Sequence, residues 1–494
     1  MKVLVVQLAR FGDIVQTIPV ANALKRNPEM ELHFLCRQRF SDAANLCPAI
    51  DQLHVLDTKN ILAPIIMSPF NGKPLDGDEN SLARLTDWLD GLREQKFDRI
   101  INLSFSPISS FLVHYIACET TLISGYTRHS DGYLHIPDDS SAYFYAQVGI
   151  NKNNRIHISD LFGLIANVEY QTSDWTLSVE DDELVRQKYG LLEGKYVVVH
   201  IGASQKYKAV SESSWIEIIL SLNASSKLVL LGVESEAEIA EAIEKQVGNK
   251  KSIINLVGKT SLFDLPAILK SAELLVGCDS LPIHICSLVD TPVLNLSFSS
   301  VNFWETGPLS KKSSILWYPK PVDLDTKQVA YAIDSLLVGE VELARTYSLN
   351  DKDSIEKYKW NGNKLKASFP WNLIKAIYLG HPFPVLDDIN IYRSMVKFKE
   401  LVQIVIHQLS QLGTEKFGDQ NLRICQQVDS TIDVLLNICP ELEPMIRWMQ
   451  TEKLRIPPGD LDEIYRTTLE IYKKAVDVMN IYLGEDYEQP SLAK

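Results

Sequence analysis

Residues 273–296, ELLVGCDSLPIHICSLVDTPVLNL, contain two strands and a helix in one short segment. The apolar run Leu274–Val276 leads into Asp279–Ser280, two residue types that often begin helices. Thr291–Pro292 then ends the helical segment before a second apolar run, Val293–Leu296. This order predicts a parallel α/β sheet with polar residues at the carboxyl end of its first strand, which is where such sheets bind ligands.

His284 follows Asp279 by five residues, about one helical turn into the predicted helix. We therefore expect its side chain to face the same crevice as Asp279. The exposed N–H groups at the start of such a helix suit a phosphate group. Taken alone, a capped helix with a histidine in its core explains the pattern equally well.

Length and composition limit the class of protein. A chain of 494 residues predicts two or three domains. The formal net charge of −14 argues against a nucleic-acid binder, and no apolar run is long enough to span a bilayer. The start of the chain, MKVLVVQLARFGD, is typical of a first strand rather than of a signal peptide. Seven cysteines without a CxxC pair favour reduced thiols in a cytosolic protein, and no metal site.

Strands and helices alternate along two successive stretches of the chain, which predicts two doubly wound α/β domains with a ligand crevice between them. Strands of the first stretch are expected at Val3–Leu8, Glu31–Cys36, Gln52–Leu56, Arg99–Leu103 and Leu122–Gly125, with a first helix at Ile14–Lys25. Strands of the second are expected at Tyr196–Ile201, Lys227–Leu231, Ile253–Val257, Leu274–Val276 and Val293–Leu296. The long connection Leu62–Asn80 has the composition of a functional or mobile loop.

From about Ala344 onward we expect no further strands. Two stripes with alternating spacings of four and three residues predict a small helical bundle. They are Ile391, Met395, Phe398, Val402, Val405, Leu409 and Leu412, then Leu461, Ile464, Thr468, Ile471, Ala475, Val478 and Tyr482. The stripes favour the core of the bundle itself, and a role in self-association stays open. The expected domains are 1–172, 173–340 and 341–494.

Three further positions carry candidate chemistry. Asp13, at the start of the first helix after Gly12 in a tight turn, suits either the helix dipole or a general base. Lys208 lies on the loop after a strand and is either a surface lysine or a partner for a diphosphate. Glu234 follows the next strand, where it is either a helix-start acid or an acceptor for the hydroxyls of a ribose.

Five blocks of sequence resemble a known family. They are LARFGDIVQTIPVANALK, VVVHIGAS with Lys208, LVLLGVESE, INLVGKTSLFDLPAILKSAELLVGCDS and LPIHICSLVDTPVLNL. In this order they resemble glycosyltransferase family 9, the ADP-heptose:lipopolysaccharide heptosyltransferases, over roughly residues 1–340. The resemblance implies a GT-B fold, in which two Rossmann-like domains face a crevice. The first domain would bind the acceptor, the second the nucleotide-sugar donor, and residues 341–494 add an all-α region.

The resemblance also implies roles for individual residues. They are Asp13 as general base, Lys208 at the donor phosphate, Glu234 at the ribose, Gly258 in the wall of the adenine pocket, and Asp279, Ser280 and His284 beside the diphosphate and sugar. The implied reaction inverts the anomeric centre without a metal or another cofactor, and ADP-heptose would be its substrate. Two positions depart from the family pattern: Leu281 stands where the family has glycine, and Val210 where it has an aromatic residue.

The function expected from the sequence is therefore an inverting, heptosyltransferase-like glycosyltransferase. Its acceptor would be a lipopolysaccharide core or a protein, reached in the cytoplasm or at the inner face of the cytoplasmic membrane by peripheral contact. A turnover-deficient family member that serves as a binding or assembly module is the alternative. In either case, 341–494 could hold an oligomer or a protein partner.

Overall fold

The computed structural model describes residues 1–61, 78–149, 152–179, 182–203, 205–223, 226–339, 346–349, 358–360, 368–411 and 418–484. Most of the expected loop Leu62–Asn80 and position Leu412 of the first stripe lie outside these residues. The chain divides into two units. The first comprises Met1–Ser104, Tyr115–Ile123 and Arg155–Leu365, and the second comprises Phe105–His114, Ser124–Asn154 and Lys366–Lys494. The expected domain boundaries after residues 172 and 340 remain predictions.

The first sheet of the first unit has the strand order β3-β2-β1-β4-β5. Its strands are β1 Lys2–Val6, β2 Glu31–Arg37, β3 Gln52–Leu56, β4 Arg99–Asn102 and β5 Leu122–Gly125. The central strand β1 pairs in parallel with β2 and with β4, and Val3–Val6 are fully buried. Helices along this part of the chain are α1 Phe11–Lys25, α2 Ser41–Asn45, α3 Thr58–Ile61, α5 Asp78–Arg93 and α8 Ile158–Ala166. Every strand expected for this stretch is present.

The second sheet has the order β10-β9-β8-β11-β12-β13-β14-β15. Its parallel strands are β8 Tyr196–His200, β9 Lys227–Leu231, β10 Ile253–Asn255, β11 Leu274–Cys278, β12 Val293–Phe298 and β13 Ser314–Tyr318. The helices between them are α9 Asp182–Lys188, α10 Glu212–Ser221, α11 Ala237–Val247, α12 Leu265–Lys270, α13 Leu281–Val289, α14 Phe303–Thr306 and α15 Thr326–Leu337. Buried side chains from the sheet and from α10, α11 and α15, including Trp215, Ile243 and Ile333, form one core.

The expectation that strands end before Ala344 is wrong. Strands β14, Thr346–Leu349, and β15, Tyr358–Trp360, extend the second sheet beyond β13. Both pair antiparallel, β14 with β13 and β15 with β14. Antiparallel neighbours such as β14 and β15 need no helix between them. The alternation of strands with helices, which predicted the parallel strands, therefore could not predict this hairpin.

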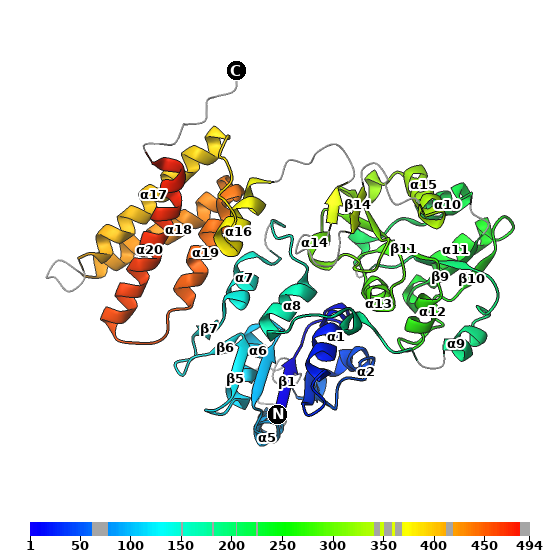
Figure 1. The fold of residues 1–494 in the computed structure, drawn as a ribbon, viewed down its shortest axis with the longest axis horizontal. Coiled ribbons are helices and arrows are strands. Elements are labelled where there is room, and N and C mark those ends of the chain that lie inside the picture. Colours follow the sequence, from blue (N-terminus) through cyan, green and yellow to red (C-terminus); the bar gives the residue numbers. More distant parts are fainter. Residues whose placement is uncertain are drawn as a thin grey trace. The chain divides into compact units, whose positions relative to one another are not determined.

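The second unit contains a bundle of five helices: α16 Phe369–Leu379, α17 Ile389–Leu409, α18 Asp419–Ile438, α19 Glu443–Leu454 and α20 Leu461–Leu483 (Figure 1). The stripe of α17 is buried from Ile391 to Val405, as expected for the core of a bundle. On α20 the stripe is exposed at its start, where Leu461 is 67 % exposed, and its buried members are Ile471, Ala475 and Tyr482. Within the described residues, no helix is both long and apolar enough to cross a membrane.

The same unit includes α6, Pro107–Ile116, the strand pair β6 Thr127–Arg128 and β7 Leu134–His135, and α7, Asp139–Gln147. Helix α19 packs against α7, and Arg455 forms an ion pair with Asp139 at 2.8 Å. Gln147 is buried, and its Nε2 donates to the carbonyl of Pro444 at 3.0 Å and to the hydroxyl of Tyr378 at 3.3 Å. The C-terminal helices therefore pack against α7, which lies more than 200 residues earlier in the chain.

We predict that Gln147→Ala destabilises the second unit by about 1–3 kcal/mol, because the carbonyl of Pro444 loses a buried donor. Urea unfolding followed by circular dichroism measures this change. Asn437→Ala is the matched control, since it removes an amide that is exposed and bonds only within its own helix. Equal, small losses in the two variants would contradict the structural role of Gln147.

Candidate active site

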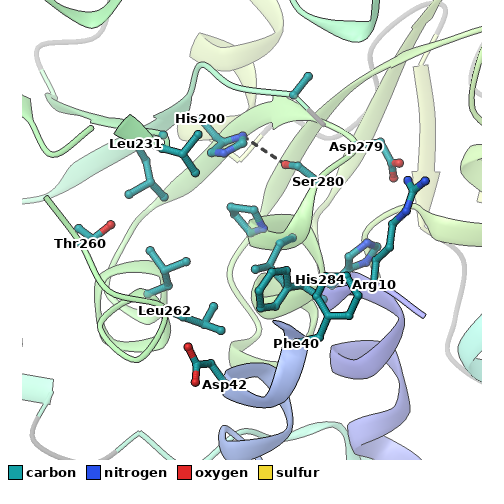
Figure 2. A pocket seen from close by; sticks show the side chains of 18 of the residues that line it. Arg10, Phe40, Asp42, His200, Leu231, Thr260, Leu262, Asp279, Ser280 and His284 are labelled. Carbon is teal, nitrogen blue, oxygen red and sulfur yellow. Dashed lines mark hydrogen bonds between the residues drawn. The ribbon is translucent and has the colours of Figure 1, made fainter. Parts of the chain in front are cut away.

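A cavity of about 970 Å³ lies within the first unit and is lined by residues from both of its sheet-and-helix halves (Figure 2). Its lining contains all seven residues selected from the sequence: Asp13, Lys208, Glu234, Gly258, Asp279, Ser280 and His284. All except His284 lie at or just beyond the carboxyl ends of parallel strands or at the first turn of the following helix, and His284 lies one turn further. The fold therefore brings residues that are far apart in the sequence together at the carboxyl-end edges of the two sheets.

Asp13 lies in the first turn of α1, which begins at Phe11 rather than at the expected Ile14. Its Oδ2 accepts the backbone N–H of Arg10 at 3.0 Å, so the carboxylate caps the helix that carries it. Burial raises the pKa of Asp13, and the N–H of Arg10 and the charges of His284 and Arg10 oppose that rise. A carboxylate with a raised pKa is a stronger base than an exposed one.

Gly12 does not form the tight turn expected from the sequence. It lies inside α1, and its φ is not positive. A Cβ at this position would lie 3.0 Å from Cδ2 and 3.1 Å from Nε2 of His284. The glycine therefore lets α1 approach α13, and this approach brings Asp13 close to His284.

His284 is 7 % exposed. Burial lowers its pKa, while the nearby carboxylates of Asp279 and Asp13 act in the opposite direction. Asp279 is itself held by Thr306, whose hydroxyl donates to Oδ1 at 2.9 Å. The imidazole thus lies between two acidic groups and remains largely neutral because it is buried.

Ser280 is the N-cap residue of α13, but its side chain does not cap the helix. Its hydroxyl instead donates to the carbonyl of Cys278 at 2.9 Å and lies 3.2 Å from Nδ1 of His200 (Figure 2). Burial lowers the pKa of His200 to about 4, which keeps this imidazole neutral. The first turn of α13 is therefore left without a side-chain cap, on the wall of the cavity.

The segment after β9 carries two glutamates with different surroundings, and the loop after β10 carries Gly258. Glu236 is half-buried, and its Oε2 accepts the N–H of Val233 at 2.7 Å. Glu234 is exposed and lines the cavity, and its carboxylate forms no hydrogen bond within the part of the chain that the structure describes. Gly258 has φ +71°, and a Cβ there would lie 2.0 Å from Oε2 of Glu234. Gly258 is thus needed both for the turn and for the position of this carboxylate.

Lys208 ends the short 3₁₀ helix Lys206–Lys208 and is half-buried. It forms no ion pair with any described residue, so its ammonium group is available to a ligand in the cavity.

The two residues that depart from the family pattern lie in different surroundings. Leu281 lines the cavity, whereas Val210 is buried and does not line it. Over the described ranges, no three histidine, cysteine or carboxylate side chains cluster as a metal site would require.

Sequence reasoning missed several residues of the lining: Arg10, Arg39, Phe40, His200 and Thr306. His200 ends strand β8, so its place at a carboxyl strand end was a usable signal. Arg39 and Phe40 lie in a 3₁₀ helix after β2 and offered no comparable pattern. Thr306 reaches the site from α14, and only the fold brings it to Asp279.

Two Rossmann-like halves, each a parallel sheet with flanking helices, around one cavity form a fold of the GT-B type. Residues 87–330 match the model of glycosyltransferase family 9 (heptosyltransferase). The chain thus carries a glycosyltransferase family 9 domain, and the resemblance seen in the sequence is confirmed.

Curated relatives agree with this assignment. Lipopolysaccharide heptosyltransferase 3 of Escherichia coli K12 is 24 % identical over 304 residues, which cover 58 % of this chain and 79 % of the relative. Lipopolysaccharide heptosyltransferase 1 of Campylobacter coli is 22 % identical over 312 residues, covering 60 % and 83 %.

Solved structures show the same fold. A glycosyl transferase family 9 protein from Veillonella parvula superposes with a TM-score of 0.53 at 18 % identity, covering 68 % of this chain and 97 % of that chain. ADP-heptose lps heptosyltransferase II from E. coli gives 0.50 at 15 % identity, covering 69 % and 99 %. The GT-B expectation is therefore confirmed.

We predict that Gly258→Ala weakens nucleotide binding, because its methyl group must displace the carboxylate of Glu234. Gly190→Ala is the matched control, since Gly190 has a similar φ of +68° but open space around it. Both variants should lose about 1–2 kcal/mol of stability through backbone strain. Isothermal titration with ADP should show weaker binding for Gly258→Ala alone, and unchanged affinity would contradict the proposed contact.

Proposed function

We propose that this protein is an inverting glycosyltransferase that moves a heptose, or a related sugar, from an ADP-activated donor to an acceptor hydroxyl. The observation that carries the proposal is the presence of Asp13, Lys208 and the uncapped start of α13 in one cavity. A general base, a cation and a helix N-terminus are the groups that an attack on an activated sugar requires. The relatives named above supply heptose and ADP as the first candidates for the donor.

Asp13 is the proposed general base. Its carboxylate takes the proton of the acceptor hydroxyl while the hydroxyl oxygen forms a bond to the anomeric carbon. The bond from that carbon to the diphosphate oxygen breaks on the opposite face, and ADP leaves with the electron pair. The raised pKa of Asp13 supports this role, because a stronger base accepts the proton more readily near neutral pH.

The second half of the first unit is the proposed donor site. Lys208 and the N–H groups at the start of α13 stabilise the charge that develops on the diphosphate. The carboxylate of Glu234, which has no hydrogen-bond partner among the described residues, accepts hydroxyls of the ribose, and Gly258 borders the adenine. Ser280, Asp279 and His284 complete the wall beside the diphosphate and the sugar.

The acceptor is proposed to bind the first half, as a lipopolysaccharide core or a protein. The names of the curated relatives favour lipopolysaccharide. The C-terminal helices keep a protein acceptor, an oligomer or a protein partner open. All seven cysteines are free thiols, which supports a location in the reducing cytoplasm, with peripheral contact at the inner membrane face.

A second candidate is a binding or assembly module that has lost turnover. Leu281 and Pro282 favour it, because both line the cavity at the start of α13 and proline removes one N–H donor there. Lys208, which has no ion-pair partner among the described residues, and the half-buried Asp13 with its raised pKa favour catalysis. Transfer activity decides between the two candidates.

We predict that ADP raises the thermal transition of the protein more than UDP or GDP does. ADP at 100 times its Kd should add about 2.7 kcal/mol to the native state. Lys208→Ala should weaken binding of ADP more than binding of AMP, since the lysine faces the diphosphate. Lys250→Ala, an exposed lysine outside the cavity, is the control. A stronger response to UDP or GDP would leave the fold assignment unchanged but would contradict ADP as the nucleotide of the donor.

We predict that Asp13→Asn lowers transfer by about 10²–10⁴-fold and leaves ADP affinity unchanged. Asparagine can still accept the Arg10 N–H, so the helix cap survives. Asp477→Asn, on the exposed face of α20, controls for the loss of one charge. Near wild-type transfer by Asp13→Asn would remove this residue from the mechanism.

The raised pKa of Asp13 also predicts how stability and transfer change with pH in the wild type and in Asp13→Asn. Because burial raises the folded-state pKa of Asp13, its stabilising contribution is full below the unfolded pKa and is lost as pH rises through the folded pKa. Asp13→Asn should therefore be at least as stable as the wild type at neutral pH. The wild-type transfer rate should rise with pH through the raised pKa.

A further inference from the structure

We propose that Thr306 and His157 are positioning residues for Asp279, and that they hold its carboxylate ready to accept a hydroxyl of the transferred sugar. This inference rests on the proposed function, because it takes the ligand beside Asp279 to be the sugar of the donor. The support of Asp279 itself rests on the contacts that follow.

Asp279 has one oxygen that the protein holds and one that it does not. Its Oδ1 accepts the hydroxyl of Thr306 at 2.9 Å, and both residues line the cavity. Its Oδ2 accepts no hydrogen bond from any residue that the structure describes. A carboxylate that is fixed through one oxygen presents the other in a defined direction, and an ionised carboxylate only accepts hydrogen bonds. The second oxygen therefore suits a ligand that offers a donor, such as the hydroxyl of a sugar.

Helix α14, which carries Thr306, is held in place by its neighbours. It has only four residues, and a helix of this length is not stable on its own. Its first residue, Phe303, packs against Ile315 of β13. Just after the helix, the N–H of Leu309 donates to Oγ of Ser287 in α13 at 2.9 Å. The place of the Thr306 hydroxyl therefore depends on contacts outside α14.

His157 adds a support from the first half. It is 2 % exposed and is the N-cap residue of α8, where its Nδ1 accepts the N–H of Ser159 at 3.1 Å. Because Nδ1 is an acceptor, the ring proton lies on Nε2, which donates to the carbonyl of Gly307 at 3.1 Å. Gly307 follows Thr306 directly. His157 thus fixes the chain next to the residue that holds Asp279.

The same contacts bear on the separation of two carboxylates. Helix α8 packs against α1, the helix that carries the proposed base Asp13. A second set of contacts therefore joins α1 to Asp279 through α8, His157 and α14, besides the direct contact of α1 with α13. One carboxylate faces the acceptor hydroxyl and the other the sugar in the proposed reaction, and such an attack requires that both keep a fixed geometry.

The test compares the binding of ADP and of ADP-heptose to the full-length protein by isothermal titration. Thr306→Val keeps the shape of the side chain and removes the donor. We expect it to weaken ADP-heptose binding about tenfold and to leave ADP binding unchanged. Thr306→Ser, which keeps the hydroxyl, should recover most of that loss. Thr467→Val on α20 is the matched control, because the hydroxyl of Thr467 donates within its own helix.

His157→Asn separates the two contacts of the histidine. Asparagine is a good N-cap residue, so the cap of α8 survives, but it has no atom at the place of Nε2 to reach Gly307. We expect this variant to weaken ADP-heptose binding about threefold to tenfold. The double variant with Thr306→Val should bind no more weakly than Thr306→Val alone, since both changes act through Asp279. His407→Asn, at an exposed position of α17, is the control.

Equal losses for ADP and ADP-heptose, additive losses in the double variant, or no recovery by Thr306→Ser would overturn the inference and leave the proposed donor in place. Absence of ADP binding by the wild type would instead refute the proposed donor. Urea unfolding of the same ligand-free proteins then still tests the support. A stability loss in the double variant that is smaller than the sum of the single losses would support it, and additive losses would overturn it.

Discussion

The close approach of α1 to α13 is the contact on which the proposed site depends. It is possible because Gly12 has no side chain, and a Cβ there would press on the ring of His284 at 3.0 Å. The contact brings together the starts of two helices, one from each half of the first unit. Asp13 and the uncapped first turn of α13 thereby line one cavity, so that the proposed base and the proposed phosphate-binding element face the same space.

Burial at this contact sets the charges of the groups involved. It raises the pKa of Asp13 and lowers the pKa of His284, so both groups shift toward their neutral forms. His200 is shifted in the same sense, to about 4, and so remains neutral beside Ser280. The fixed positive charge of the cavity therefore comes from Lys208 and from the arginines of the first half.

The sequence predicted the two sheets and all seven selected residues of the cavity, because parallel strands place polar residues at their carboxyl ends. It did not predict the start of α1 at Phe11 or the true role of Gly12, since both depend on packing against His284 in another part of the chain. The hairpin of β14 and β15 and the arginines around Phe40 were missed for a related reason. Antiparallel edge strands and contacts across the fold leave no periodic pattern in the sequence.

The C-terminal helices cannot be separated from the rest of the chain without loss of packing in the second unit. Its core combines the C-terminal helices with residues 124–154, through the buried Gln147 and the ion pair of Arg455 with Asp139. Those residues lie in sequence between β5 and α8, which belong largely to the first unit. The packing of this segment therefore requires the last helices, and its contacts with them join residues that are far apart in the sequence. A shortened chain that ends before α16 would expose the face of α7 that α19 covers, and the helical region is therefore a structural part of the protein.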